Sequence, residues 1–384
     1  MTNVLLIYEH FIPSVKLCAY DQLNYLHEQG KITLYHCCVK EITKEMCIKS
    51  DIVFFIRSAS ILEKRLASEF KKQGKLLIYS IDDDLLNVPD NLSSSSFYRL
   101  NNVKKRIVSI MKQCDYMITP SPLLAKKYGN MFKKYSIIEE PCSTKPINER
   151  SNQNNVKIGF AGSIDRAADI NNIVSGAIRN LISKYGDRVT VEFMGAEPEI
   201  VKELNLTYFP YEDNYDSYKK RLDMLNWDIG LAPLPDTLFH NRKHYNKFIE
   251  YSSANIVGVY SKVQPYTRVI QNEINGILCD NTEEAWVNAV SWLIDHNEER
   301  EAIRDFNNRL MIEQYSIPVV AEHLYTSFDE ISFYKAAECS YFPINKIKFI
   351  SIVIKLYEFV IKNGIRSPWV LFQKCFELLK KRSI

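Results

Sequence analysis

The sequence predicts an α/β protein with two Rossmann-like, doubly wound parallel sheets, one in each half of the chain. Short apolar strand runs alternate with amphipathic helical patterns, which is typical of parallel sheets covered by helices on both faces. A polar segment interrupts the alternation at 143–155, and the alternation restarts at Val156. The chain has 384 residues, of which 46% are hydrophobic and 25% charged, so it can bury two cores and is not a disordered protein.

Residues 1–142 are expected to form the first domain. An apolar run at 4–8 predicts its first strand, and a helical pattern at 13–29 follows until Gly30, a residue that commonly ends helices. Further strands are predicted at 32–39, 51–57, 75–81 and 115–119, and helices near 60–73, 97–112 and 121–128. Strand and helix therefore alternate through this half of the chain.

Residues 143–155 have the composition of a linker, with Pro146, a run of Asn, Gln and Ser, and one aliphatic side chain, Ile147. Residues 156–316 are expected to form the second domain. Its elements would be a strand run at 156–163, a helix to about 184, and strands near 188–194, 206–210, 227–232, 256–260 and 276–279. Helices near 282–296, 297–313 and 317–335 would complete this half.

The segment 227–251, WDIGLAPLPDTLFHNRKHYNKFIEY, points most directly to a ligand. An apolar run closed by Pro233 indicates a buried strand, and a helical pattern from 243 to 254 places Lys243, Lys247 and Glu250 on one side. A loop and helix that follow such a strand lie at the carboxyl edge of the sheet, where ligands bind. Two cations suit a diphosphate and one carboxylate suits ribose hydroxyls, so the set suits a nucleotide-sugar.

Two turns add candidate phosphate contacts. The turn at 162–166 ends the first strand of the second half, and glycine there lets backbone N–H groups approach an anion at a helix amino terminus. The turn at 264–266 would open another helix with free amides. The candidate donor contacts in these turns are Gly162, Ser163, Arg166, Gln264, Pro265 and Tyr266.

The segment 227–251 resembles the donor-binding segment of GT-B glycosyltransferases of the retaining family 4 type, in the branch that builds polysaccharides and cell-envelope glycans. The matching positions are Phe239, Lys243, Lys247, Phe248, Glu250 and Tyr251. His240 and His244 replace Asn and Ser of the family pattern, and Arg242 stands where its Glu-x7-Glu element has the first Glu. The resemblance implies two domains that face a central cleft, a donor site in the second domain, retention of anomeric configuration, no metal, and a last helix at 317–339 that crosses back to the first domain.

Three consecutive carboxylates, Asp82, Asp83 and Asp84, follow the predicted strand at 75–81, and Arg57 ends the strand at 51–57. In the resembling family this loop faces the cleft from the acceptor side. The resemblance therefore implies that Asp82 and Asp83 orient or deprotonate an acceptor hydroxyl, with Asp84 beside them. Arg57, which points to the same edge of the sheet, either pairs with these aspartates or meets a phosphate on the acceptor. The residues alone leave two alternatives open: the aspartates cap a helix, or Asp82 and Asp84 hold a divalent cation as in GT-A glycosyltransferases.

The tail, residues 340–384, carries much of the positive charge. It contains nine Lys or Arg and two Glu, whereas the whole chain has a net charge of +3. Between 347 and 362 the polar residues form one narrow stripe on an otherwise apolar helix, and a second amphipathic helix is expected around 369–379. The tail either packs on the protein core or lies on an anionic membrane surface, where each basic residue contributes about 1 kcal/mol.

The cysteine spacing and the hydropathy pattern indicate the cellular compartment in which the protein is expected. Nine cysteines form no CxxC pair, which predicts buried, reduced thiols and neither disulfides nor a zinc site. No uncharged 18-residue stretch and no signal peptide are present, so a transmembrane span is not expected. We expect a cytoplasmic protein that associates peripherally with the inner face of the membrane and binds no nucleic acid.

These features predict a glycosyltransferase of the hexosyltransferase class that moves a sugar from a nucleotide-diphosphate-sugar to a glycan or lipid-linked acceptor. Lys243 and Lys247 would stabilise the departing diphosphate, and Glu250 would hold the ribose. The nucleotide-sugar is a co-substrate, and no cofactor or metal is expected. Two alternatives stay open: a metal-dependent GT-A-like enzyme that uses Asp82 and Asp84, and a non-catalytic scaffold subunit of a polysaccharide assembly, which Arg242 in place of Glu suggests.

Overall fold

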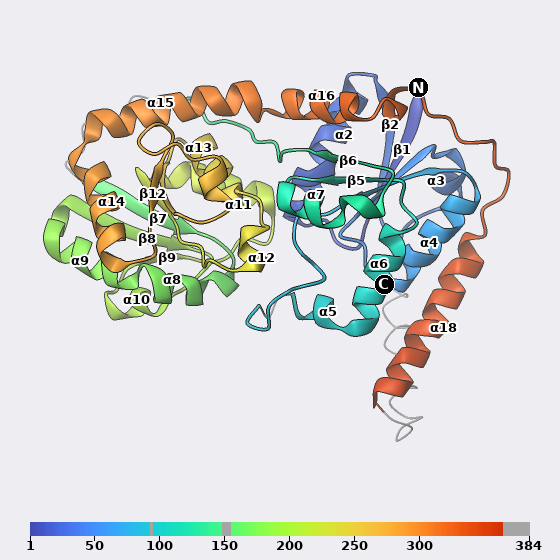
Figure 1. Ribbon diagram of the computed structural model, residues 1–384, viewed down its shortest axis with the longest axis horizontal. Coiled ribbons are helices and arrows are strands. Elements are labelled where there is room, and N and C mark those ends of the chain that lie inside the picture. The colour runs from blue at the N-terminus through green and yellow to red at the C-terminus, as the bar shows by residue number, and fades with distance from the viewer. Residues whose placement is uncertain (93–94, 148–154, 364–384) are drawn as a thin grey trace.

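The computed structural model describes residues 1–92, 95–147 and 155–363 and contains two parallel sheets, as the sequence predicts, each with six strands (Figure 1). The strands of the first sheet are β1 (Thr2–Tyr8), β2 (Ile32–Cys38), β3 (Ile52–Ile56), β4 (Leu76–Ser80), β5 (Tyr116–Thr119) and β6 (Lys134–Ile137), in the order β2-β1-β3-β4-β5-β6. Those of the second are β7 (Val156–Ala161), β8 (Val189–Met194), β9 (Thr207–Phe209), β10 (Ile229–Ala232), β11 (Val257–Ser261) and β12 (Ile277–Cys279), in the order β12-β11-β10-β7-β8-β9. We call each sheet with its helices the first and the second domain.

Helices cover both faces of each sheet (Figure 1). The helices before the second sheet are α1 (Pro13–Val15), a π-helical turn η1 (Lys16–Tyr20), α2 (Asp21–Glu28), α3 (Lys44–Lys49), α4 (Ile61–Lys72), α5 (Ser96–Arg99), α6 (Asn101–Met111), α7 (Pro122–Tyr128) and η3 (Gly129–Met131). Those that follow are η4 (Ile164–Arg166), α8 (Ala167–Ile173), α9 (Ser175–Tyr185), η5 (Gly186–Arg188), α10 (Glu199–Glu203), α11 (Tyr215–Leu225), α12 (Leu238–Asn241), α13 (Asn246–Ser253), η6 (Tyr266–Arg268), α14 (Glu283–Asp295), α15 (Asn297–Gln314), α16 (Ile317–Ser327), α17 (Glu330–Phe333) and α18 (Ile344–Asn363).

The central strands form because their sequences are apolar on both sides. Every residue of β3 (IVFFI) and β4 (LLIYS) is buried, as expected for parallel strands between two helical layers. In the second sheet the ring of Trp227 lies on Gly159, where an added Cβ would come within 1.9 Å of the ring. Only glycine therefore fits at this position of β7.

The strand order places a topological switch point in each sheet, between β1 and β3 in the first and between β7 and β10 in the second. At such a point the chain connections leave in opposite directions, and ligands of open α/β sheets bind beside it at the carboxyl ends of the strands. Arg57 follows β3, Gly162 follows β7 and Pro233 follows β10. The fold thus gathers the candidate phosphate turn and the segment after β10 at one edge of the second sheet.

The chain passes between the two domains twice, and the two crossings lie side by side. Cys142 donates its backbone N–H to the carbonyl oxygen of Tyr315 at 2.8 Å. Beyond this point α16 packs on α2, and Val320 and Leu324 are buried in the same core as β1 (Figure 1). The paired crossings form a candidate hinge between the domains.

Several short elements were not predicted from the sequence, namely α3, β6, α10, α11 and α12. β6 lacks the signal of a buried strand because Lys134 and Tyr135 are exposed. Of the expected linker 143–155, residues 148–154 lie outside the described residues, as does the expected second tail helix at 369–379. Within the described residues, no helix combines the length and the hydropathy needed to cross a bilayer, and the cysteines are not in disulfides.

Candidate active site at the domain interface

Asp82 and Arg57 form the centre of the polar site on the first sheet. Both carboxylate oxygens of Asp82 lie 2.9 Å from Nη1 of Arg57, and Ser14 Oγ donates to Asp82 at 2.5 Å. Arg57 has a φ of 48°, a left-handed backbone conformation that is costly for a residue with a side chain and that is common at functional sites. Because β3 and β4 are neighbours, the residues that follow them meet at one edge of the sheet.

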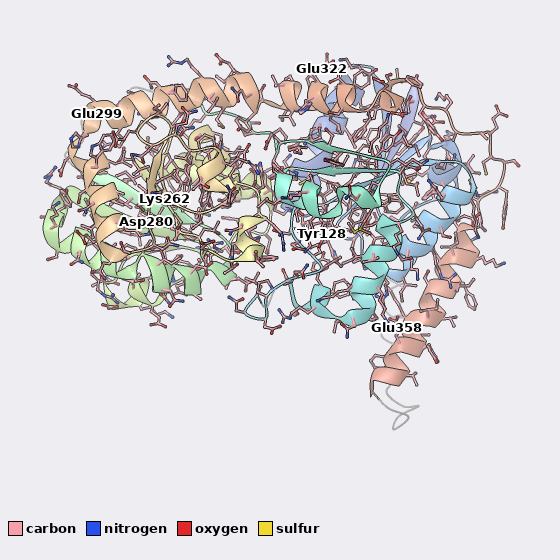
Figure 2. All side chains as sticks on the ribbon, in the orientation of Figure 1. Tyr128, Lys262, Asp280, Glu299, Glu322 and Glu358 are labelled. Atoms are coloured by element: carbon pink, nitrogen blue, oxygen red, sulfur yellow. The ribbon has the colours of Figure 1, made fainter. Side chains whose placement is uncertain are left out.

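Asp84 is fully buried, with 0% of its side chain exposed. It accepts hydrogen bonds from Lys127 Nζ at 2.7 Å, from the Tyr128 hydroxyl at 2.5 Å and from Arg242 of the second domain at 2.7 Å (Figure 2 labels Tyr128 on α7). Burial raises the pKa of Asp84, but the hydrogen bonds from Lys127, Tyr128 and Asn87 outweigh burial and hold the pKa below its ordinary value. The structure therefore gives Asp84 the role of a domain contact and not the predicted role beside the acceptor.

Lys243 crosses the domain interface to Asp83. Its Nζ lies 2.7 Å from Asp83 Oδ1, and Arg57 Nη1 lies 3.3 Å from Asp83 Oδ2. Burial alone would raise the pKa of Asp83, but the charges of Lys243 and then Arg57 outweigh it and lower the pKa to about 2. Asp83 is therefore ionised at every physiological pH, which suits orientation of a ligand and does not suit the predicted deprotonation of an acceptor.

The prediction that Lys243 shares one helix face with Lys247 and Glu250 is wrong. The helix α13 begins at Asn246, since the backbone of Tyr245, with φ of −86° and ψ of 42°, is not helical. Lys243 lies in the turn before the helix, and the turn aims its ammonium group at the first domain.

Arg166 and Lys243 are two cations of the second domain that both act on His240. Burial lowers the pKa of His240 to about 4, and the charges of Arg166 and Lys243 act in the same direction, so His240 is neutral and the positive charge belongs to Arg166 and Lys243. Arg166 donates to the carbonyl oxygen of Pro233 and pairs with Asp169 at 3.2 Å. Arg166 thus joins the turn after β7 to the loop after β10, where the sequence predicted the diphosphate.

Lys247 and Glu250 form a separate cluster inside the second domain. Glu250 accepts hydrogen bonds from Lys247 Nζ and, at 2.8 Å, from the Tyr218 hydroxyl. Lys247 Nζ also lies 3.1 Å from the Tyr218 oxygen. The helical spacing therefore placed these two residues together correctly, but they bond to each other and not to the first domain.

The two candidate phosphate turns differ from expectation. The Gly162 N–H donates to the carbonyl oxygen of Met194 at 3.0 Å, so this amide serves the protein and not a ligand. Ser163 is exposed and precedes η4, which continues directly into α8 and is followed by α9, so the helix expected to about 184 is present in segments. Gly195, with φ of 83°, lies so close that an added Cβ would be 2.1 Å from the Gly162 carbonyl oxygen, and this close approach fixes the turn after β7.

The turn at 264–266 contributes mainly to the core. Tyr266 is 4% exposed, and its ring centroid lies 4.9 Å from that of Tyr260. Pro265 is also buried, Gln264 is half-buried, and the helix that follows is the single turn η6. The side chain of Tyr266 therefore belongs to the core, whereas the donor contact through the backbone amides of this turn stays a prediction.

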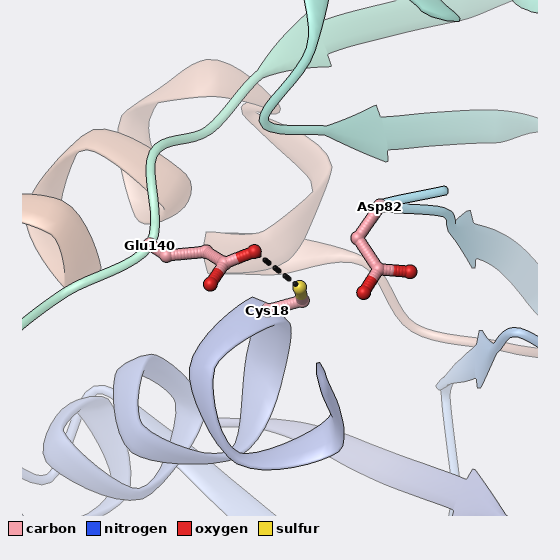
Figure 3. A group of neighbouring side chains, drawn as sticks. All are labelled: Cys18, Asp82 and Glu140. Atoms are coloured by element: carbon pink, nitrogen blue, oxygen red, sulfur yellow. Dashed lines mark hydrogen bonds between the residues drawn. The ribbon is translucent and has the colours of Figure 1, made fainter. Parts of the chain in front are cut away.

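A buried acid–base cluster at the crossing between the domains was missed in the sequence. His244 Nε2 lies 2.6 Å from Glu139, and Cys18 Sγ donates to Glu140 at 3.4 Å (Figure 3 shows Cys18, Glu140 and Asp82). Burial raises the pKa of Glu140 to about 7, with the charge of Asp82 in support and that of His244 in opposition. Burial would lower the pKa of His244, but Glu139 and Glu140 outweigh it and raise the pKa. The available signal was two adjacent carboxylates directly after the apolar pair at 137–138.

The residues do not fit the metal-dependent alternative. Asp82 is paired with Arg57, whereas Asp84 turns to Lys127 and Arg242, so the two carboxylates do not converge. In the part of the chain that the structure describes, Cys18, Asp82 and Glu140 bring three potential ligand atoms within 4.8 Å of one another. Burial, however, holds the pKa of Cys18 well above its ordinary value, so a cation would have to displace its proton.

Solved structures are similar to this chain in fold, whereas no protein-family model and no curated protein sequence matches it. The glycosyltransferase from Rickettsia africae ESF-5 has a TM-score of 0.61 at 13% identity, over 87% of this chain and 99% of that one. HepE of Anabaena in complex with UDP and glucose has a TM-score of 0.58 at 11% identity, over 85% and 99%. A putative UDP-N-acetylglucosamine 2-epimerase from Listeria monocytogenes has a TM-score of 0.55 at 10% identity, over 88% and 99%.

At these identities the likeness concerns the fold. The structural match extends over almost the full length of each of these proteins. It therefore covers both sheets of this chain and is not limited to one of them. The chain therefore has the two-domain α/β architecture of GT-B glycosyltransferases.

Proposed function

We propose that this chain is a glycosyltransferase that moves a sugar from a nucleotide-diphosphate-sugar to a hydroxyl group bound between its domains. The observation that carries the proposal is the distribution of charge at the two switch points. Arg166 and Lys243 stand at that edge of the second sheet, and Asp82 and Asp83 stand at that of the first. A diphosphate would meet the cations, and an acceptor hydroxyl would meet the carboxylates.

The donor diphosphate would replace Asp83 as the partner of Lys243. A diphosphate carries more charge than the single carboxylate that now lies 2.7 Å from Lys243 Nζ, so it can compete for this cation. Arg166 and Lys243 would then stabilise the charge that grows on the leaving diphosphate as its bond to the anomeric carbon breaks. Because HepE has this fold and a known complex with UDP and glucose, UDP is the first nucleotide to test.

We propose that Glu250 holds the ribose and that the reaction retains the anomeric configuration, as the family resemblance implies. In that step the bond from the anomeric carbon to the diphosphate oxygen breaks, the acceptor oxygen bonds to the same face, and its proton leaves on the diphosphate. Asp82, fixed by Arg57 and Ser14, would accept a hydrogen bond from the acceptor hydroxyl and orient it. The acceptor class we propose is a glycan or a lipid-linked sugar.

Titration calorimetry with UDP, GDP, CDP and dTDP tests the nucleotide site. We expect one of the four to bind best and K243A to weaken its binding by roughly 10- to 100-fold, because a charge-assisted contact is worth about 1.5–3 kcal/mol. The control is K202A, since Lys202 is exposed on α10 of the same domain. Incubation with the matching nucleotide-sugar and an oligosaccharide acceptor, followed by NMR of the product, then tests transfer and anomeric configuration.

A non-catalytic scaffold subunit is the second candidate. The observation in its favour is Arg242, which stands at the position of a family Glu and bonds to the buried Asp84. A scaffold subunit would bind none of the four nucleotides. An epimerase would convert the sugar of the nucleotide-sugar in the absence of an acceptor. Either outcome would contradict sugar transfer.

A further inference from the structure

The helix α18 packs on the first domain with its polar side. Lys348 Nζ donates to two backbone carbonyl oxygens of the segment 40–42 at 3.0 and 2.9 Å, and Ser351 is 3% exposed. Glu358 pairs with Arg106 of α6 (Figure 2 labels Glu358). Lys348, Ser351 and Glu358 of the polar stripe therefore face the protein, together with Ile344 and Ile347 of the core. Several other apolar residues of the helix are left outside.

The outward side of α18 is apolar and exposed. Phe349 is 68% exposed, Tyr357 65%, Val353 47% and Ile352 40%. Their spacing of three and four residues places them on one helix face. Contiguous apolar surface of this kind marks a binding surface in a folded protein. We call these four residues the outward face.

A groove of about 550 Å³ lies beside this helix, between α18, α4 and α6. Two carboxylates, Glu69 and Glu358, line it together with five basic side chains, Lys64, Arg65, Lys72, Lys105 and Arg106. Arg106 is paired with Glu358, and Lys72 lies 4.0 Å from Glu69. Among the described residues, no carboxylate forms an ion pair with Lys64, Arg65 or Lys105, so the groove has an excess of positive charge.

The groove and the outward face adjoin each other along the helix. Ile354 and Glu358 line the groove, and Val353 and Tyr357, each one residue earlier, belong to the outward face. One residue is a rotation of about 100° on an α-helix, so the two strips are neighbours on its surface. α18 extends beyond the rest of the first domain (Figure 1), and each of the four residues of the outward face is at least 40% exposed.

We propose that the outward face of α18 and the groove beside it bind an anionic lipid bilayer. The apolar side chains would enter the interfacial region, and the groove cations would meet lipid phosphates. A second copy of this chain fits less well, because a symmetric contact would bring two positively charged grooves together. The sequence after Asn363 adds cations of the same sign, Arg366, Lys374, Lys380, Lys381 and Arg382, against one Glu377. The proposal does not depend on the proposed sugar transfer.

Flotation of the full chain with vesicles tests the outward face. The vesicles contain equal parts of phosphatidylcholine and phosphatidylglycerol, with pure phosphatidylcholine as the comparison. We expect F349E/V353E to lower the vesicle partition coefficient at least tenfold, because charged groups do not enter the bilayer interface. The control is F333E, since Phe333 on α17 is 66% exposed and lies away from this helix face. Circular dichroism verifies that the variants are folded.

Charge reversal in the groove tests the proposed contact between the groove cations and the lipid phosphates. Each basic residue near an anionic surface contributes about 1 kcal/mol, a factor of about five, so the loss of two cations in K64E/K105E should lower anionic-vesicle binding by at least about 25-fold, and the two added carboxylates act in the same direction. K202E/K220E, on exposed lysines of the second domain, makes the same change in net charge away from the groove and should have little effect. Equal losses in the two variants would contradict a localised site.

Three other results would overturn the proposal. The first is equal binding to both kinds of vesicle. The second is a dimer in sedimentation analysis that F349E/V353E dissociates while vesicles are ignored, which would assign the outward face to self-association. The third is complete loss of vesicle binding in a chain that ends at Asn363, which would assign binding to 364–384. Removal of the whole tail from 340 is unsuitable, because Phe342, Ile344 and Ile347 belong to the core of the first domain.

Discussion

Two stretches of the second domain, one helical turn apart, use their charges differently. Residues 242–244 each reach a carboxylate of the first half of the chain, whereas Lys247 and Glu250 bond to each other. The partners across the interface are Asp84 for Arg242, Asp83 for Lys243 and Glu139 for His244. The first stretch therefore depends on how the domains are placed, and the second keeps its geometry whatever their placement. If a ligand binds at both stretches, closure of the domains would change its contacts with residues 242–244 but not its contacts with Lys247 and Glu250.

This difference assigns different tasks to residues of the same charge. Lys243 Nζ is bonded to Asp83, so under the proposed function donor binding would alter one of the three contacts that residues 242–244 make with the first half of the chain. Lys247 is already held by Glu250 and Tyr218. A ligand that binds at Lys247 would therefore change contacts inside the second domain only and would leave the contacts between the domains unaltered.

The largest effect is expected for Lys243. K243A should lower kcat for sugar transfer by roughly 100- to 1,000-fold, because it removes a positive charge from the position where the leaving diphosphate gains charge. K243R retains the charge and should restore part of the activity. A K243A enzyme with unchanged kcat and an unchanged nucleotide affinity would show that the residue serves only the contact with Asp83.

A smaller effect, on stability, is expected at Asp84. D84A should lower the free energy of unfolding by roughly 3 kcal/mol, because it leaves Lys127, Tyr128 and Arg242 without their buried acceptor. Urea denaturation measures the change. D216A is a control at an exposed carboxylate that pairs with Lys16 across the interface at 3.4 Å, where the loss should be below about 1 kcal/mol.

The contrast between the two stretches also separates what local sequence could predict from what it could not. The existence of both sheets was predictable because central strands such as β3 and β4 are apolar over most of their length, whereas the partly exposed edge strand β6 was missed. The proximity of Lys247 and Glu250 followed from helical spacing alone. The Lys243 contact did not, since the start of α13 depends on Tyr245 and on the bond from His244 to Glu139.

Contacts between distant parts of the chain explain the remaining errors. Asp84 could not be recognised as buried, because its partners Lys127, Tyr128 and Arg242 come from two other parts of the sequence. The same holds for Glu140, whose neighbour Cys18 lies on the first helical segment. Alternation and spacing predict elements and their faces, whereas the pairing of charges across the interface depends on how the domains meet.

The pH dependence of stability tests Glu140, which lies beside the contact between His244 and Glu139. Burial raises the pKa of Glu140 from 4.5 to about 7, so the folded state holds a proton that the unfolded state releases between these values. The stabilising contribution is complete below pH 4.5 and is lost as the pH rises through 7. E140Q should therefore exceed the wild type by about 2–3 kcal/mol above pH 7 and match it below pH 4.5, as measured by denaturation at each pH. A constant difference would assign the effect to packing.

The smallest effects should distinguish the two stretches directly. R242Q removes a contact across the interface, so it should shift the solution scattering profile toward more open domains, by an equilibrium change of about 1 kcal/mol. K247Q breaks an ion pair of neighbouring helical turns, which is worth about 0.3–0.5 kcal/mol, and it should leave the scattering profile unchanged. Because both substitutions remove one positive charge, net charge cannot account for a difference between them. Equal scattering from the two variants would mean that Arg242 does not hold the domains together. Its bond to Asp84 would then form as a result of the domain arrangement and would not stabilise that arrangement.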